Sequence, residues 1–197
     1  VLGSWFLAGE IELSLTLASE VTLELTDGKP RLRWSLPVSK VDPQGAGTSR
    51  QHGCSCSPGT VSKACPSHAA WDQLLFLQQK FPSRFCGPIE AMGLARPSSN
   101  LPLFPTASGD VCGKEAMVAT ICYAAERLGV RDAVDGSERV SGHSLRVTGA
   151  QGLARLGVDL WAIQLLGRWG SDRVKTYVRG VQLERAAGWA ASAARQS

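Results

Sequence analysis

The chain has 197 residues, of which 44% are hydrophobic and 19% are charged, a composition typical of one ordinary globular domain. No apolar run approaches the ~20 residues that cross a bilayer, and Val1–Phe6 lacks the basic start and apolar stretch of a signal peptide. We therefore expect an intracellular protein without a membrane partner, and the net charge of +4 permits nucleic acid as a partner without requiring it.

The first third of the chain predicts one helix and a β-hairpin. The pattern over residues 6–17 fits a helix in its first half and leaves its second half open between helix and strand. Apolar and polar residues alternate over 21–26, Asp-Gly at 27–28 supplies a turn, and the alternation resumes over 31–38. This pattern is typical of an antiparallel hairpin.

Residues 39–66 are rich in Gly, Pro, Ser and Cys without periodicity, which predicts a long surface loop. Six cysteines are too few and too irregularly spaced for a disulfide scaffold. Cys54, Cys56 and Cys65 are followed by His68, and three thiolates with an imidazole can close a tetrahedral structural zinc site. The tight spacing of the first two cysteines keeps a plain loop as the alternative. The other cysteines are interpreted as scattered thiols: Cys86, Cys112 and Cys122.

The rest of the chain predicts helices separated by loops. A Pro-, Gly- and Ser-rich connection covers 81–113, and Asp159 and Gly167 have the positions of an N-cap and a C-cap. The predicted helices cover residues 66–80, 114–128, 141–156, 159–167 and 172–177, with an alanine-rich one from 184. The predicted fold class is mainly α with a small antiparallel β-sheet, that is, α+β.

His143 and Arg146 are the first pair of side chains with a chemical interpretation. They lie three residues apart on one predicted helix face, so they can grip one phosphate together. A plain helix start with an outward arginine is the alternative. Between residues 139 and 179, seven basic residues stand against two acidic ones, a local charge of +5. Such a segment binds a DNA backbone by releasing counterions, with a solvated basic face as the alternative.

Arg146 is followed by Leu-Gly-Val-Asp-Leu, a second amphipathic helix, a Gly-Arg-Trp turn and Tyr177. This order resembles the catalytic domain of the tyrosine recombinases, the phage-integrase family that includes recombinases of mobile elements. The resemblance is strongest over residues 143–179. It implies a catalytic domain over 1–180, followed by a C-terminal helical tail over 181–197.

The resemblance also implies roles for single residues. In the family a His or Trp precedes the nucleophilic tyrosine by about nine residues; here Arg168 stands nine and Trp169 eight before Tyr177. We assign this role to Trp169, because its indole N–H can donate to a phosphate oxygen. Lys40, after the second predicted strand, matches a family lysine and would protonate the leaving 5′ oxygen. A solvated lysine is the alternative, and Lys29 is the next candidate.

One position departs from the family pattern. The first catalytic arginine of the family belongs to an Arg-x-x-Glu motif before the hairpin, and here Glu12 matches the glutamate while Gly9 stands at the arginine. The chain has no arginine before Arg31. Loss of one such preorganised donor lowers a rate ~10²-fold or more, so the sequence predicts a degenerate copy derived from a mobile element.

The resemblance predicts DNA cleavage and rejoining without a nucleotide cofactor or a catalytic metal. Tyr177 would form a 3′-phosphotyrosyl link, His143 would act as acid and base, and Arg146 would hold the phosphate. The expected partners are double-stranded DNA and, through the resemblance, further copies of the chain in a tetramer. The location would be with DNA, in the nucleus of a eukaryote or the cytoplasm and nucleoid of a bacterium.

Two other functions stay open at this point. One is a recombinase-derived domain that binds DNA but has lost turnover with the arginine at Gly9. The other is a zinc-dependent interaction module built on the cysteines and His68. Type IB topoisomerases share a related residue set, and we rank them lower because the motif spacing follows the integrase pattern. Since the chain starts at Val1 inside patterned sequence, we treat it as a fragment, with any DNA-clamping domain before it left open.

Overall fold

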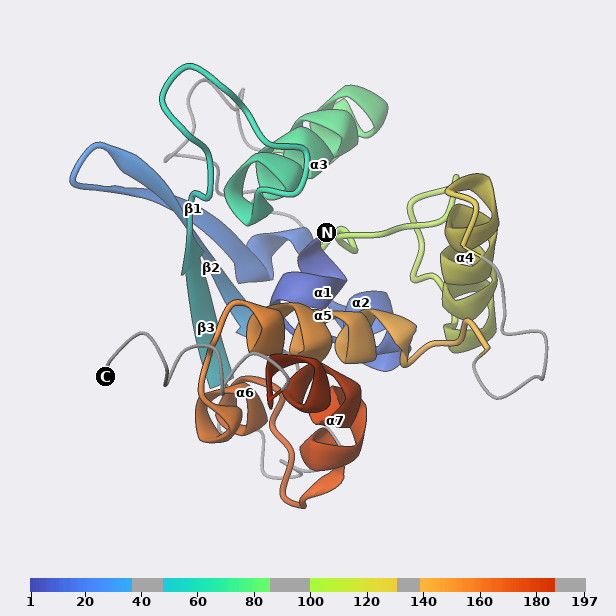
Figure 1. Ribbon diagram of the computed structural model, residues 1–197. Coiled ribbons are helices and arrows are strands. Elements are labelled where there is room, and N and C mark those ends of the chain that lie inside the picture. Colours follow the sequence, from blue (N-terminus) through green and yellow to red (C-terminus); the bar gives the residue numbers. More distant parts are fainter. Residues whose placement is uncertain (37–47, 86–99, 131–138, 187–197) are drawn as a thin grey trace.

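A computed structural model gives the fold and describes residues 1–36, 48–85, 100–130 and 139–186. A small antiparallel sheet lies at the left of the view, with α1 and α2 near the centre (Figure 1). The strands are β1 (Val21–Thr26), β2 (Lys29–Leu36) and β3 (Thr48–Gly53), in the spatial order β1-β2-β3. The α-helices are α1 (Leu2–Trp5), α2 (Glu10–Leu15), α3 (Pro66–Lys80), α4 (Lys114–Arg127), α5 (Ser144–Arg155), α6 (Leu160–Leu166) and α7 (Arg173–Ala186). Two short 3-10 helices are η1 (Ala18–Glu20) and η2 (Pro82–Arg84). These elements confirm the predicted α+β fold class.

The predicted hairpin is formed by β1 and β2. Leu23 pairs with Leu32 and Val21 with Trp34, and all four side chains are buried. Trp34 meets the ring of Phe6 edge-on, with the ring centroids 4.9 Å apart. The alternating pattern therefore places one face of the hairpin in the core, as a period of two requires.

The strand β3 corrects the prediction of an unbroken loop over 39–66. It pairs with β2 at the edge of the sheet, so that His52 lies opposite Leu32 and Arg50 opposite Trp34. The burial of β3 alternates while its side chains are polar throughout, which is why the hydropathy pattern gives no strand signal. Arg50 Nη2 also donates to the carbonyl of Leu165 in α6 at 2.9 Å, which links the sheet to the C-terminal helices.

Two hydrophobic clusters divide the core, and the segment after α1 contributes to both. Phe6 belongs to the cluster of the sheet and α3, whereas Leu7 belongs to the cluster formed by α5, α6 and α7. A positive φ of 50° at Leu7 lets consecutive side chains point into different clusters. The helix predicted for the first half of 6–17 is therefore wrong, because α1 ends at Trp5 and α2 begins only at Glu10.

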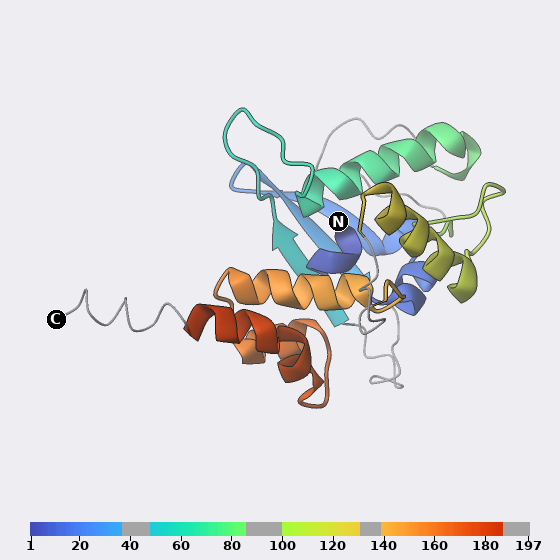
Figure 2. The same ribbon diagram turned by 45° about the vertical axis from the view of Figure 1, so that its right-hand side comes forward.

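The C-terminal helices pack against α1 from below in the view, with α5 lying between α1 and α7 (Figures 1 and 2). The Asp159 side chain caps α6 by accepting from the Trp161 N–H, as predicted. The helix α7 is longer than the predicted 172–177, because Val174, Val178 and Val181 form one buried stripe along it. It therefore runs on through Ala186 without a break. No helix in the described ranges is long and apolar enough to cross a membrane.

Two glycines of α5 provide a matched test of this packing. A Cβ at Gly149 would overlap the Ser4 carbonyl oxygen, whereas a Cβ at Gly152 would meet nothing within 4 Å. We expect Gly149→Ala to lower the free energy of unfolding by about 1–3 kcal/mol through overpacking. Gly152→Ala should raise it by about 0.5–1 kcal/mol, because alanine loses less backbone entropy in a helix. Denaturant unfolding of both variants measures these changes, and equal effects would contradict the close contact between α1 and α5.

Candidate functional site

The carboxylate of Glu12 joins three distant parts of the chain. Its Oε1 accepts hydrogen bonds from Arg146 Nη2 at 2.5 Å and from Arg168 Nη2 at 3.0 Å. Its Oε2 accepts the backbone N–H of Gly9 at 2.9 Å. Arg146 lies on α5 and Arg168 directly after the C-cap of α6, so this carboxylate holds two guanidinium groups side by side. We call Glu12, Arg146 and Arg168 the arginine cluster.

The arginine cluster is largely buried and carries one net positive charge. The exposed fractions of the side chains are 9% for Glu12, 15% for Arg146 and 10% for Arg168. Burial alone would raise the pKa of Glu12, but the charges of both arginines and the hydrogen bond from Arg146 lower it below its ordinary value. The buried Nε of Arg146 has no hydrogen-bond partner within the described residues. A surplus cation with an unused donor is suited to an anion.

Gly9 lies directly beside this cluster. A Cβ built on it would be 2.9 Å from Glu12 Oε2 and 3.5 Å from Arg146 Nη2. As the N-cap of α2, Gly9 has φ −89° and ψ 177°, an extended conformation open to any L-residue. A side chain at position 9 would therefore begin at the edge of the arginine cluster.

His143 lies next to the arginine cluster on the exposed side. It is the N-cap residue of α5, its side chain is 69% exposed, and its Nδ1 is 3.9 Å from Glu10 Oε2. Glu10 is buried and also lies 3.7 Å from Lys114 Nζ at the start of α4. The short helix α2 thus presents two carboxylates two residues apart, one toward His143 and one toward Arg146. His143 and Arg146, which the sequence predicts as a pair, therefore both lie beside α2.

Tyr177 lies on α7, and its ring faces the ring of Trp169 with the centroids 5.6 Å apart. The backbone carbonyl of Tyr177 accepts from Gln151 Nε2 of α5 at 3.2 Å. The Trp169 ring covers Gly167, since a Cβ there would lie 2.5 Å from it. The Trp169 indole thus packs against the Tyr177 ring. The residue that enters the arginine cluster is Arg168, which precedes Trp169 in the chain.

Arg168 was not selected from the sequence, although one signal pointed to it. It stands nine residues before Tyr177, the spacing expected for the His or Trp of the family. Its φ of 54° is unusual for a residue other than glycine, and this left-handed turn follows directly on α6. Such backbone strain is often found at functional sites.

Of the two candidate lysines, the structure describes only Lys29. Lys40 lies outside the described residues. Lys29 begins β2 at the exposed tip of the hairpin.

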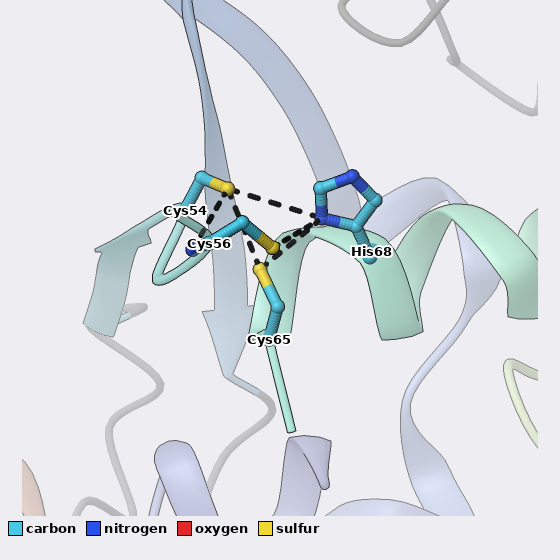
Figure 3. Close-up of side chains that lie close together, drawn as sticks. All are labelled: Cys54, Cys56, Cys65 and His68. Atoms are coloured by element: carbon cyan, nitrogen blue, oxygen red, sulfur yellow. Dashed lines mark hydrogen bonds between the residues drawn. The ribbon is translucent and has the colours of Figure 1, made fainter. Parts of the chain in front are cut away.

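The structure brings the four predicted metal ligands together (Figure 3). The ligand atoms of Cys54, Cys56, Cys65 and His68 all lie within 4.8 Å of one another, and we call these residues the cysteine cluster. Burial alone would raise the pKa of Cys65, but hydrogen bonds from His68, Ser55 and Cys54 lower it to about 6. The other described cysteines, Cys112 and Cys122, lie outside the cluster, and Cys86 is outside the described residues.

The described residues form a mixed α/β domain whose fold resembles that of a tyrosine-recombinase domain. Among solved structures, the chain is similar to the site-specific recombinase XerH in a post-cleavage complex with its palindromic difH substrate, with a TM-score of 0.57 and 16% identity. The similarity covers 94% of this chain and 43% of the XerH chain, so the chain spans less than half of that protein's length. No family model matches, and no curated protein matches.

The ion pairs of Glu12 predict a specific loss of stability. We expect Glu12→Gln to lower the free energy of unfolding by about 3 kcal/mol, because it leaves two buried guanidinium groups without a counter-charge. Glu24→Gln is the matched control, since Glu24 pairs with Arg33 at the surface and should cost less than about 1 kcal/mol. Urea unfolding at neutral pH measures both changes.

The difference in stability between the unmodified chain and Glu12→Gln should depend on pH. Both arginines lower the pKa of Glu12 in the folded protein below its ordinary 4.5. The stability advantage of the unmodified chain over Glu12→Gln is therefore full above pH 4.5 and is lost as the pH falls through the lowered pKa. An advantage that stays constant down to acid pH would contradict the ionised carboxylate.

Proposed function

We propose that this chain is a DNA breaking and rejoining domain of the tyrosine-recombinase type. The observation that carries the proposal is the meeting of Arg146 and Arg168 on Glu12, with a buried Arg146 donor left unused. The recombinase-type fold supports it, as does the position of Tyr177 beside the residue that follows Arg168.

The proposed reaction is a transfer of one phosphodiester bond. The Tyr177 oxygen attacks the phosphorus, the bond to the 5′ oxygen breaks, and a 3′-phosphotyrosyl link and a free 5′-hydroxyl result. His143 accepts the tyrosine proton, and a cationic side chain returns a proton to the leaving oxygen; the resemblance gives this second role to Lys40. Attack by a 5′-hydroxyl of another strand reverses the chemistry and releases Tyr177.

In this proposal Arg168 takes over the work of the absent arginine. Two guanidinium groups are needed on the non-bridging oxygens, because charge develops there in the transition state. Gly9 cannot supply one, but Arg168 holds a second guanidinium on the same carboxylate as Arg146. A phosphate entering the site would compete with Glu12 for both. The site would therefore keep two guanidinium groups even though position 9 is a glycine.

The proposed partner is double-stranded DNA, held by the basic segment over residues 139–179, which carries +5. We further propose that the domain acts with other copies of itself on DNA inside the cell. The second candidate function is a domain that binds DNA without cleaving it, and the glycine at position 9 favours it. The two functions differ in one product, the covalent protein–DNA link.

A suicide substrate separates these two functions. Duplexes selected from a randomised pool for binding, and nicked beside the scissile phosphate, should trap a covalent adduct that is visible on a denaturing gel. The chain has two tyrosines, so Tyr177→Phe should abolish the adduct while Tyr123→Phe on α4 leaves it unchanged. Binding to DNA without any adduct would support the second candidate.

The role of Arg168 predicts a graded effect on the same assay. Arg168→Gln should slow adduct formation about 10²-fold, because one preorganised donor is lost. Arg173→Gln, an exposed position on α7, should change the rate far less. Gly9→Arg in the Arg168→Gln background should restore part of the rate, since the new side chain would enter the same cluster. An Arg168→Gln variant as fast as the unmodified chain would rule out the replacement.

A further inference from the structure

The cysteine cluster joins the end of β3 to the start of α3 (Figure 3). Cys54 and Cys56 follow β3 directly, and Cys65 is the N-cap residue of α3. Pro66 at the first helical position fixes where α3 begins, so His68, three residues after Cys65, faces the same side. Two short segments from separate elements therefore point their ligand atoms at one another.

Four of the six distances between ligand atoms in the cysteine cluster are close to those of a tetrahedral metal site. His68 Nδ1 is 3.3 Å from the sulfurs of Cys56 and Cys65 and 3.8 Å from that of Cys54. The sulfurs of Cys54 and Cys65 are 3.6 Å apart. Zinc bonds of ~2.3 Å to sulfur and ~2.0 Å to nitrogen place tetrahedral ligand atoms ~3.5–3.8 Å apart. A disulfide would bring two sulfurs to ~2.05 Å, so the spacing fits a shared metal ion instead.

Each of the three sulfurs accepts a hydrogen bond from a backbone N–H group. Ser62 donates to Cys56 Sγ at 3.2 Å, Cys56 to Cys54 Sγ at 3.4 Å, and Ser55 to Cys65 Sγ at 3.5 Å. Hydrogen bonds of this kind orient metal ligands and spread the charge of a thiolate. Three thiolates around a divalent ion leave one negative charge at the N-terminus of the 15-residue helix α3, where the helix dipole favours it.

We propose that the cysteine cluster binds one Zn²⁺ ion as a closed structural centre. Soft thiolate ligands with one imidazole in a tetrahedral arrangement select zinc over magnesium or calcium. The four protein ligands fill all four positions, so the ion has no open position for substrate and its role is to hold the fold. This centre is independent of the proposed DNA chemistry, which uses no residue of the cysteine cluster.

The surroundings show what the zinc centre would hold in place. The strand β3 is a mostly polar edge strand, and its His52 ring packs against the rings of Trp5 and Phe6. The segment around the cluster is attached to the rest of the fold at Pro30, whose carbonyl accepts from Cys54 N–H at 2.9 Å and from Ser67 Oγ at 3.4 Å. Trp5 Nε1 donates to the Ala64 carbonyl at 2.7 Å. A metal ion here would fix β3 and α3 together beside the sheet.

Metal analysis of the full purified chain tests the proposal. We expect elemental mass spectrometry to find one zinc ion per chain. The Cys56→Ser variant should lose this ion, and the Cys122→Ser variant should keep it. Cys122 is a matched control, because its Sγ donates to the Val140 carbonyl outside the cluster and a serine hydroxyl can do the same. A chain that carries no stoichiometric zinc, and binds none when Zn²⁺ is added, would overturn the proposal.

A second measurement does not depend on whether a variant folds. The unmodified chain, stripped by a chelator and titrated with Co²⁺, should show thiolate charge-transfer bands and the strong visible bands of a tetrahedral site, saturating at one equivalent. Zinc should displace the cobalt, protect three cysteines from alkylation and raise the melting temperature. An octahedral cobalt spectrum, or a Cys54–Cys65 disulfide in the freshly purified chain, would contradict the zinc centre.

Discussion

The shared carboxylate of Glu12 is the constraint on which the arrangement of this domain depends. It lies on the six-residue helix α2, yet it binds arginines 134 and 156 positions further along the chain. The two hydrophobic clusters of the core meet at the segment between α1 and α2, with Phe6 in one and Leu7 in the other. The ion pairs therefore fix the C-terminal helices to the N-terminal segment at the same place where the packing changes from one cluster to the other.

In the proposed reaction, this constraint also bears on the glycine at position 9. Glu12 holds both guanidinium groups side by side before DNA binds, and an entering phosphate would have to displace it from them. Gly9 lies close to both residues, since a Cβ built on it would be 2.9 Å from Glu12 Oε2 and 3.5 Å from Arg146 Nη2. Under the proposal, Arg168 supplies the second cation that the glycine cannot.

The sequence predicted the elements in which periodicity and burial agree. The hairpin predicted from the alternation over 21–26 and 31–38, the helix from Pro66 and the Asp159 cap followed from local patterns. The strand β3 did not, because an edge strand with polar residues on both faces has no hydropathy signal. The pairing of Arg168 with Glu12 did not follow from the local sequence either, since it depends on a left-handed turn after α6 and on a partner 156 residues away. The role assigned to Trp169 stays a prediction. The cysteine cluster was recognised from its residue types, while only the fold shows that β3 and α3 bring its members within ligand distance.

We propose that Arg146 and Arg168 together form the phosphate site and that Glu12 pairs with both until a phosphate binds. The most direct measurement is a crystal structure of the Tyr177→Phe variant bound to a duplex that the unmodified chain cleaves. We expect the oxygens of the scissile phosphate to lie within hydrogen-bond distance of both guanidinium groups, with the aromatic ring at position 177 close to the phosphorus. A phosphate bound elsewhere, with both arginines still on Glu12, would contradict it.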